Sequence, residues 1–241
     1  MRVTGRHKKR VLPPVSGFCL ILRPPTRRNR KNVLSRERHF YQPKNGHRLA
    51  HDPFNSIVAP RPIGWISTKS PNGQVNLAPY SFFNAFNYQP PIIGFSSIGF
   101  KDSVKNAQES GEFCWNLVSR SHAEAMSQTS AAVSSDIDEF EFAGLSKRES
   151  TIVGAPHVAD CPVVMECKTT QIVQLQSVQG EKCETWLVLG EVVGVHILET
   201  FIKDGVYQTV KTEAVMRGGG AADYFGISEA NRFQLFRPKV D

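Results

Sequence analysis

The chain has 241 residues, of which 40% are hydrophobic and 21% are charged. These proportions are typical of a globular domain and exclude a chain that is disordered throughout. The net charge of +7 comes from one end, because residues 1–38 hold twelve Lys or Arg and one acidic residue, whereas residues 39–241 hold 17 basic and 21 acidic residues. The body is therefore mildly acidic, which argues against nucleic acid as its partner.

The first 38 residues are rich in Arg and Pro and lack periodic hydrophobicity. We therefore predict a disordered basic tail over residues 1–38 and one folded domain over residues 39–241. Three roles stay open for the tail: a transit peptide, a nuclear or nucleic-acid-binding patch at RRNRKN (residues 27–32), or an extension without a role.

The compartment is predicted from apolar runs and cysteines. No apolar run approaches the roughly 20 residues that span a bilayer, so we expect no membrane association. The five cysteines are odd in number and form no CxxC pair, which argues against a secreted disulfide framework. We expect a cytoplasmic protein, with mitochondrial import by the basic tail as the alternative.

The body consists mostly of predicted β-strands. The first two are joined by Asn72-Gly73, a strong hairpin signal. Gly190 and Gly194 within the last strand predict bends or bulges of a curled sheet. Antiparallel hairpins with few helices favour a barrel or sandwich, so we predict a mainly β fold. The predicted strands are residues 62–69, 74–78, 91–99, 112–119, 162–175 and 185–198.

Two helices interrupt the strands. Residues 102–111 have Asp and Ser at the start and Gly at the end, and residues 121–131 have Ser121 as the expected N-cap. The acidic, irregular region 132–158 is predicted to be a surface loop or lid.

The stretch NLAPYSFFNAF (residues 76–86) combines a proline, two amides and four aromatics. Pro79 lacks an N–H, so the chain must leave the sheet there or lie at its edge. The backbone groups of Ala78, Tyr80 and Ser81 would then be free to bind a flat ligand with polar edges. A proline bulge beside an aromatic core is the alternative.

Two neighbouring motifs extend this candidate site. In FKDSVKNAQESG (residues 100–111), Lys101 precedes a helix whose first N–H groups are unpaired, which is typical of a phosphate site. An ordinary capped helix with a surface lysine is the alternative. In RPIGWIST (residues 61–68), Gly64 permits close approach of a ligand or a second backbone, and Trp65 is either core or a ring contact. The hairpin turn places this strand beside residues 74–78.

These motifs together resemble the flavin reductase-like family, whose fold is the FMN-binding split barrel. The resemblance covers roughly residues 41–225 and is carried by five ordered runs, at residues 59–96, 101–119, 123–145, 155–168 and 187–197. It implies an antiparallel split β-barrel with a few flanking α-helices, and a homodimer with FMN near the interface. It also implies that the segment ending near Tyr224 closes over the flavin or the partner subunit.

The resemblance also implies where FMN binds. The flavin ring and ribityl chain would lie between residues 61–68 and 76–84, and the phosphate on the Lys-Asp-Ser run. No catalytic acid or base is identified, since His157 and His196 are lone strand histidines and such residues are more often structural. No metal site is expected. The predicted cofactor-binding residues are Arg61, Trp65, Ser67, Thr68, Asn76, Ala78, Pro79, Tyr80, Ser81, Phe82, Asn84, Lys101, Asp102 and Ser103.

Three functions follow as hypotheses. The first is an FMN-dependent oxidoreductase that uses NADH or NADPH to reduce free flavin or a small-molecule acceptor. The second is an electron-transfer flavoprotein that receives electrons from a protein partner. The third is a non-catalytic ligand-binding or dimerisation module whose basic tail binds nucleic acid.

The glycine-rich segment RGGGAADYFG (residues 217–226) does not follow a predicted strand, as a dinucleotide-binding loop would.

Overall fold

The computed structural model describes residues 37–239, so the predicted tail lies almost wholly outside the described residues. The described residues up to Arg48 and those from Leu49 onward form two separate units. In the described part of the first unit, a 3₁₀ turn spans Pro43–Asn45, and the Arg48 guanidinium donates to the carbonyl of Phe40 at 2.6 Å. Everything that follows concerns the second unit.

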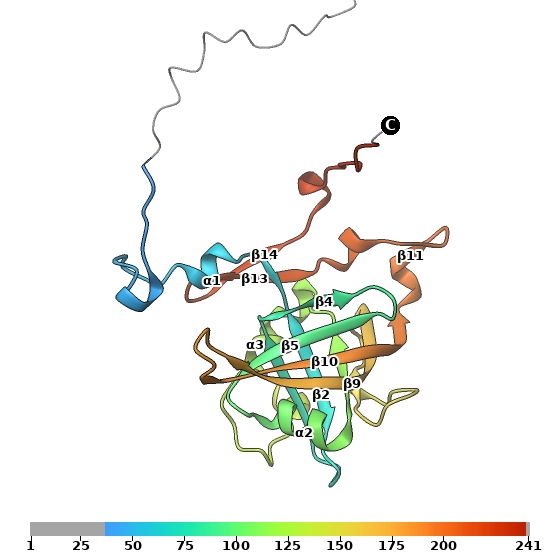
Figure 1. The fold of residues 1–241 in the computed structure, drawn as a ribbon. Coiled ribbons are helices and arrows are strands. Elements are labelled where there is room, and N and C mark those ends of the chain that lie inside the picture. Colours follow the sequence, from blue (N-terminus) through green and yellow to red (C-terminus); the bar gives the residue numbers. More distant parts are fainter. Residues whose placement is uncertain (1–36, 240–241) are drawn as a thin grey trace, which may run out of the picture. The chain divides into compact units, whose positions relative to one another are not determined.

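The second unit is built on a seven-stranded antiparallel sheet with strand order β3-β2-β6-β9-β10-β5-β4 (Figure 1). All six predicted strands belong to it, which confirms the mainly β prediction. Strands β3 and β4 form its two edges, and β4 was not predicted. The strands are β2 (Gly64–Lys69), β3 (Val75–Tyr80), β4 (Phe83–Asn87), β5 (Ile92–Ile98), β6 (Glu112–Asn116), β9 (Val163–Gln176) and β10 (Lys182–Ile197).

Smaller ladders accompany the large sheet. A three-stranded sheet joins β1, β13 and β14, and its β13–β14 hairpin was also not predicted. Two further pairs are β7 with β8 and β11 with β12. Their bounds are β1 (Arg61–Pro62), β7 (Lys147–Arg148), β8 (His157–Val158), β11 (Ile202–Lys203), β12 (Val206–Tyr207), β13 (Val215–Gly219) and β14 (Asp223–Gly226).

Glycines let the large sheet curl. The β9–β10 register shifts at Leu189/Gly190 and again at Val192/Gly194, which confirms the predicted bulges. A Cβ on Gly190 would lie 2.4 Å from the ring of Phe113, so only glycine fits against this core aromatic. Such bulges increase the twist that closes a sheet toward a barrel.

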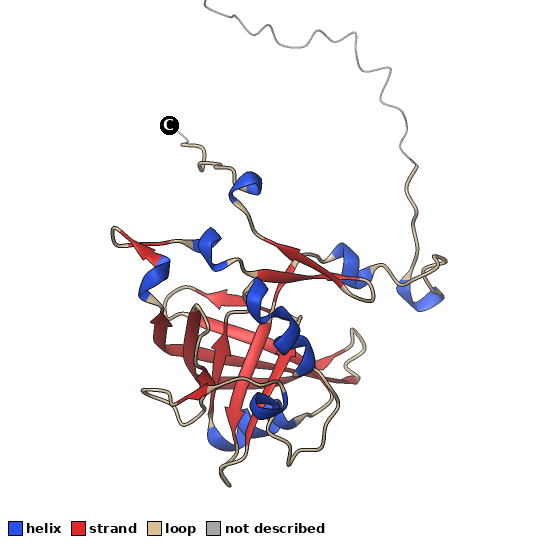
Figure 2. Cartoon of the chain, turned by 180° about the vertical axis from the view of Figure 1, so that it is seen from behind, coloured by secondary structure: helices blue, strands red, loops and turns tan. Residues whose placement is uncertain are grey.

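Short helices cover parts of the sheet (Figure 2). Helix α2 packs across β2 and ends at Gly111, whose φ of 74° is left-handed, as its sequence predicted. The second predicted helix is shorter than expected, because a 3₁₀ turn over Arg120–His122 precedes α3. Ser119 is the N-cap of that turn, and His122, not the predicted Ser121, is the N-cap of α3. The helices are α1 (Phe54–Ile57), α2 (Asp102–Ser110), α3 (Ala123–Gln128) and α4 (Glu139–Phe142).

The prediction of a surface loop at residues 132–158 is correct only in part. Most of these residues are exposed, but Phe140 and Val158 are completely buried and Val153 is nearly so, and all three pack into the core cluster that contains Trp65. The segment therefore contributes apolar side chains to the core, and α4 and the β7–β8 pair give parts of it regular structure.

The four described cysteines are free thiols. Cys114 is completely buried on β6, and Cys183 on β10 is only half-buried. Burial raises the pKa of Cys114 to about 12 and raises those of Cys161 and Cys167 well above the ordinary value.

A buried carboxylate joins the loop before β8 to the large sheet. Glu166 on β9 is fully buried and accepts hydrogen bonds from the N–H groups of Thr151, Ile152 and Val153 at 2.6–2.9 Å. His196 on β10 donates to it through Nε2 at 2.5 Å. Burial by itself would raise the pKa of Glu166, but these hydrogen bonds outweigh it and lower the pKa to about 2.

We predict that Glu166→Gln lowers the free energy of unfolding at pH 7 by about 3 kcal/mol, because the amide NH₂ would face backbone donors. The folded-state pKa lies below the ordinary value of 4.5, so the carboxylate stabilises the fold above that pH. This stabilisation is lost as the pH falls toward 2.

Urea denaturation of wild type and variant at pH 7, 4.5 and 3 measures this, with the exposed Glu149→Gln as control. If the difference in the free energy of unfolding between wild type and Glu166→Gln is as large at pH 3 as at pH 7, the prediction is contradicted.

Candidate functional site

Strand β3 lies at a sheet edge, as Pro79 predicted. Among residues 37–239 its only ladder partner is β2, with Pro79 opposite Trp65. The N–H of Leu77 points away from β2, because it donates to Oε2 of Glu139 at 3.0 Å. Backbone groups of alternate residues face the same side, so Pro79 faces outward with Leu77, while Ala78 and Tyr80 face β2. The expectation that the backbones of Ala78 and Tyr80 are free is therefore wrong.

Two adjoining cavities follow this open edge. The first, here called the Lys101 cavity, has a volume of about 320 Å³, and the second, the Arg217 cavity, about 370 Å³. Pro79 and Ser130 line both, so the two cavities adjoin at the edge of β3. Each has the size of an ordinary small-molecule site.

The Lys101 cavity contains the start of α2. Lys101 is the N-cap, and its carbonyl accepts from the N–H groups of Val104 and Lys105 at 2.9 and 3.0 Å. The N–H groups of Asp102 and Ser103 precede these first helical bonds and lie at the positive end of the helix. With the exposed ammonium of Lys101 beside them, they form a site suited to an anion.

A carboxylate lines the same cavity. Glu139, at the start of α4, is 8% exposed and shares the cavity with Lys101 and Asp102. Burial raises its pKa, and the charges of Asp102 and Asp138 raise it further, against the opposing effect of the Leu77 hydrogen bond. Nothing in the sequence pattern singled out this residue, because its segment has the composition of an acidic surface loop.

The Arg217 cavity combines apolar walls with a cation. Ile63 and Met126 line it beside Tyr224, and the Arg217 guanidinium lies 5.0 Å from the Tyr224 ring. Arg217 also donates to carbonyls of its own hairpin, including that of Asp223 at 2.8 Å, and so holds the β13–β14 turn in place. An aromatic ring with a polar edge suits this combination.

A second arginine, Arg61, joins the segment before β1 to the end of β3. Arg61 donates to the carbonyls of Ser81 at 2.9 Å and Val58 at 2.5 Å. Burial lowers its pKa, and the neighbouring charge of Arg217 lowers it further. Arg61 therefore ties the α1–β1 segment to the end of β3, and its donors are directed at backbone carbonyls.

The structure brings together seven of the fourteen predicted cofactor-binding residues at the two cavities. They are Asn76, Ala78, Pro79, Tyr80, Ser81, Lys101 and Asp102. Asn76 donates to the buried Ser103 hydroxyl at 2.8 Å, so Ser103 supports the floor of the Lys101 cavity without lining it.

The other predicted residues lie elsewhere. Trp65 is completely buried and donates to Thr129, while Ser67 and Thr68 are buried under hydrogen bonds from Asn116 and Asn106. The close approach at Gly64 is that of the Phe83 ring, which a Cβ would meet at 2.8 Å. Phe82 lies under the Arg61 guanidinium and Asn84 is exposed on β4.

Neither His157 nor His196 lines these cavities. His157 is buried with its ring 5.2 Å from that of His196, and His196 binds Glu166. Among the described residues, the Nε2 atom of His157 has no hydrogen-bond partner. Sequence patterns did not predict four of the lining residues, Met126, Ser130, Glu139 and Arg217. Of these, only Arg217 lies in a motif noted above, the glycine-rich segment at residues 217–226, whose hairpin was not predicted.

Residues 57–213 match the model of the flavin reductase like domain. The chain belongs to this family. The match spans the whole large sheet and the Lys101 cavity and ends before the β13–β14 hairpin, and it confirms the family resemblance of the sequence.

Solved structures of similar fold support this assignment. Component B of nitrilotriacetate monooxygenase from Bacillus cereus is 28% identical, with a TM-score of 0.69 over 76% of this chain and 90% of that one. The 2-nitrobenzoate 2-nitroreductase of Pseudomonas fluorescens is also 28% identical, with a TM-score of 0.67 over 77% and 88%. A putative flavin reductase with a split barrel domain from Shewanella frigidimarina, 24% identical with a TM-score of 0.67 over 76% and 89%, shows the fold.

We predict that Glu139→Gln stabilises the protein at pH 8 by about 1 kcal/mol, because the amide oxygen still accepts from Leu77 and no charge is buried. The folded-state pKa of Glu139 lies above the ordinary value of 4.5. The free energy of unfolding of the wild type should therefore fall as the pH rises above 4.5. At pH 4 the variant should be as stable as the wild type. Thermal denaturation from pH 4 to 8 measures the difference. The exposed Glu124→Gln is the control, and a constant difference at all pH values would refute the assignment.

Proposed function

We propose that this protein is an FMN-binding oxidoreductase that takes electrons from NADH or NADPH and reduces free flavin or a small-molecule acceptor. The family supports a flavin-related redox activity. One observation carries the proposal further: the open edge of β3 joins an anion site at Lys101 to an apolar, cationic cavity at Arg217. A flavin mononucleotide has the same two ends, a phosphate and a flat ring with a polar edge.

The residues present fit that cofactor. Lys101 and the first N–H groups of α2 would hold the phosphate, and Ile63, Met126 and Tyr224 would contact the ring. When bound, FMN would supply the hydride and electron chemistry. The transfer of a hydride requires no histidine, and neither His157 nor His196 lines the two cavities.

The chain's contribution would be electrostatic. Arg217 places a fixed positive charge at the ring end, and Arg61 adds a second one behind Ser81. Positive charges held in place stabilise negative charge that develops on reduction, without reorganisation. The two arginines would therefore favour the reduced ring.

The similar solved structures indicate only the class of the electron acceptor. Component B of nitrilotriacetate monooxygenase and the 2-nitrobenzoate 2-nitroreductase are redox proteins by name. A small acceptor would approach the ring through the open side of the Arg217 cavity.

We also propose that two copies associate beside the Arg217 cavity. Tyr224 and Phe225 on β14 are 44% and 52% exposed. Exposed aromatics next to a ring-binding cavity suit burial by a second subunit. Sedimentation velocity at micromolar concentration tests this, and a monomer at all concentrations would overturn it.

We predict that Lys101→Gln weakens FMN binding about tenfold and leaves riboflavin binding unchanged, because only FMN carries the phosphate. Lys105→Gln, one turn along α2 and exposed, is the matched control and should bind both ligands as wild type does. Isothermal titration calorimetry measures the dissociation constants. Equal weakening of FMN and riboflavin would refute the phosphate position.

A visible absorption spectrum followed by anaerobic addition of NADH or NADPH tests the activity. We expect an oxidised-flavin spectrum, with or without added FMN, that bleaches on reduction. A bound flavin that stays oxidised would point to a protein electron donor instead. Failure to bind any flavin would overturn the proposed function.

A further inference from the structure

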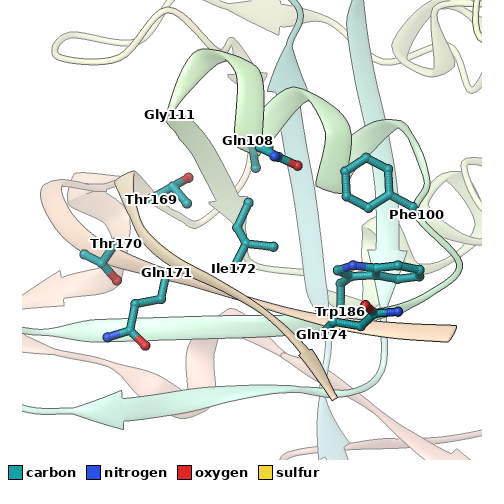
Figure 3. A pocket seen from close by; sticks show the side chains of 10 residues that line it. Phe100, Gln108, Gly111, Thr169, Thr170, Gln171, Ile172, Gln174 and Trp186 are labelled. Atoms are coloured by element: carbon teal, nitrogen blue, oxygen red, sulfur yellow. The ribbon is translucent and has the colours of Figure 1, made fainter. Parts of the chain in front are cut away.

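A third cavity of about 380 Å³ lies between α2 and strands β9 and β10 (Figure 3). We call it the Trp186 cavity. None of the side chains that line it is charged. Its chemistry is instead that of amides, hydroxyls and two aromatic rings, which the flavin site described above does not use.

The aromatic end of the cavity is a Phe–Trp pair. The rings of Phe100 and Trp186 meet edge to face, with centroids 5.3 Å apart and planes at 76° (Figure 3). Phe100 is 46% exposed, and Trp186 is half-buried. Such a pair offers a ready stacking surface to a flat ring, because aromatic faces attract one another beyond the area they bury.

The polar end has unused hydrogen-bonding groups. The Oγ1 atom of Thr169 is buried without a partner among the described residues. In the same described part of the chain, no hydrogen bond engages the side-chain amides of Gln108 and Gln171, which flank the cavity in Figure 3. A buried polar atom without a partner needs an explanation, and a ligand with donors and acceptors on its edge supplies one.

The position of the cavity identifies the ligand. Phe100 lines the Trp186 cavity, and the next residue, Lys101, lines the Lys101 cavity. Consecutive Cα atoms are about 3.8 Å apart, so one residue of the aromatic pair and the Lys101 ammonium come from neighbouring positions at the start of α2. A flat, neutral, hydrogen-bonding group attached to a phosphate at Lys101 would fit both.

We propose that the Trp186 cavity binds the adenine of an adenine nucleotide whose phosphates lie at Lys101, and that this nucleotide is FAD. The proposal rests on the proposed flavin site. The uncharged lining suits a neutral nucleobase better than a phosphate, and the phosphates would be held by Lys101. The base stacks on Phe100 and Trp186 and bonds to the amide and hydroxyl groups of the polar end.

The test compares FAD and FMN binding to Phe100→Ala by isothermal titration calorimetry. Loss of a stacking aromatic should weaken FAD binding about tenfold. FMN binding should stay within about twofold of wild type, because FMN has no adenine. Phe100 is largely exposed, so its removal should leave the fold intact.

A second variant removes a polar contact far from Lys101. Gln171→Ala on β9 should also weaken FAD selectively, by about threefold or more. Tyr88→Ala, an aromatic that is 93% exposed at the end of β4, is the matched control and should change neither affinity.

The outcomes separate the claims. Equal weakening of FAD and FMN by Phe100→Ala, or no change in either together with an unchanged KM for NADH, overturns the adenine site. An unchanged FAD affinity with a raised KM for NADH, measured with FMN as cofactor, supports an adenine site but overturns FAD as its source. If wild type binds neither flavin, the proposed function itself fails, whereas FMN binding without a selective FAD effect defeats only this inference.

Discussion

A strand at the edge of a sheet exposes half of its backbone hydrogen-bonding groups, and the candidate site depends on how β3 uses this edge. Pro79 has no N–H to offer, and the N–H of Leu77 is taken by Glu139. These two features keep another strand from pairing there. The edge stays open, and the two cavities that α2, α3 and the β13–β14 hairpin complete lie along it.

Two buried glutamates show how the number of donors decides the state of a carboxylate. Glu166 accepts three backbone N–H groups and the ring of His196, so its charge is well stabilised and its pKa is lowered. Glu139 accepts one N–H and lies near other acids, so its pKa is raised. The first joins a loop to the sheet, and the second places a titratable group beside the anion site.

Local patterns in the sequence were sufficient for six of the seven strands of the large sheet and for part of the site. The hairpin signal at Asn72-Gly73, the proline at position 79 and the helix start after Lys101 all predicted features that the structure contains. Alternation along β2 could not separate the core face from a ligand face, so Ser67 and Thr68 were predicted for binding although they are buried. Glu139 and Arg217 reach the site only through tertiary packing, which no local pattern encodes.

The buried thiols have a consequence for the protein's chemical durability. Oxidation of cysteine follows its thiolate fraction and its accessibility. Cys114, Cys161 and Cys167 are buried and their raised pKa values keep them protonated near neutral pH. They are therefore poor targets for oxidants and alkylating agents, and this part of the core can tolerate the reactive oxygen that redox proteins commonly meet.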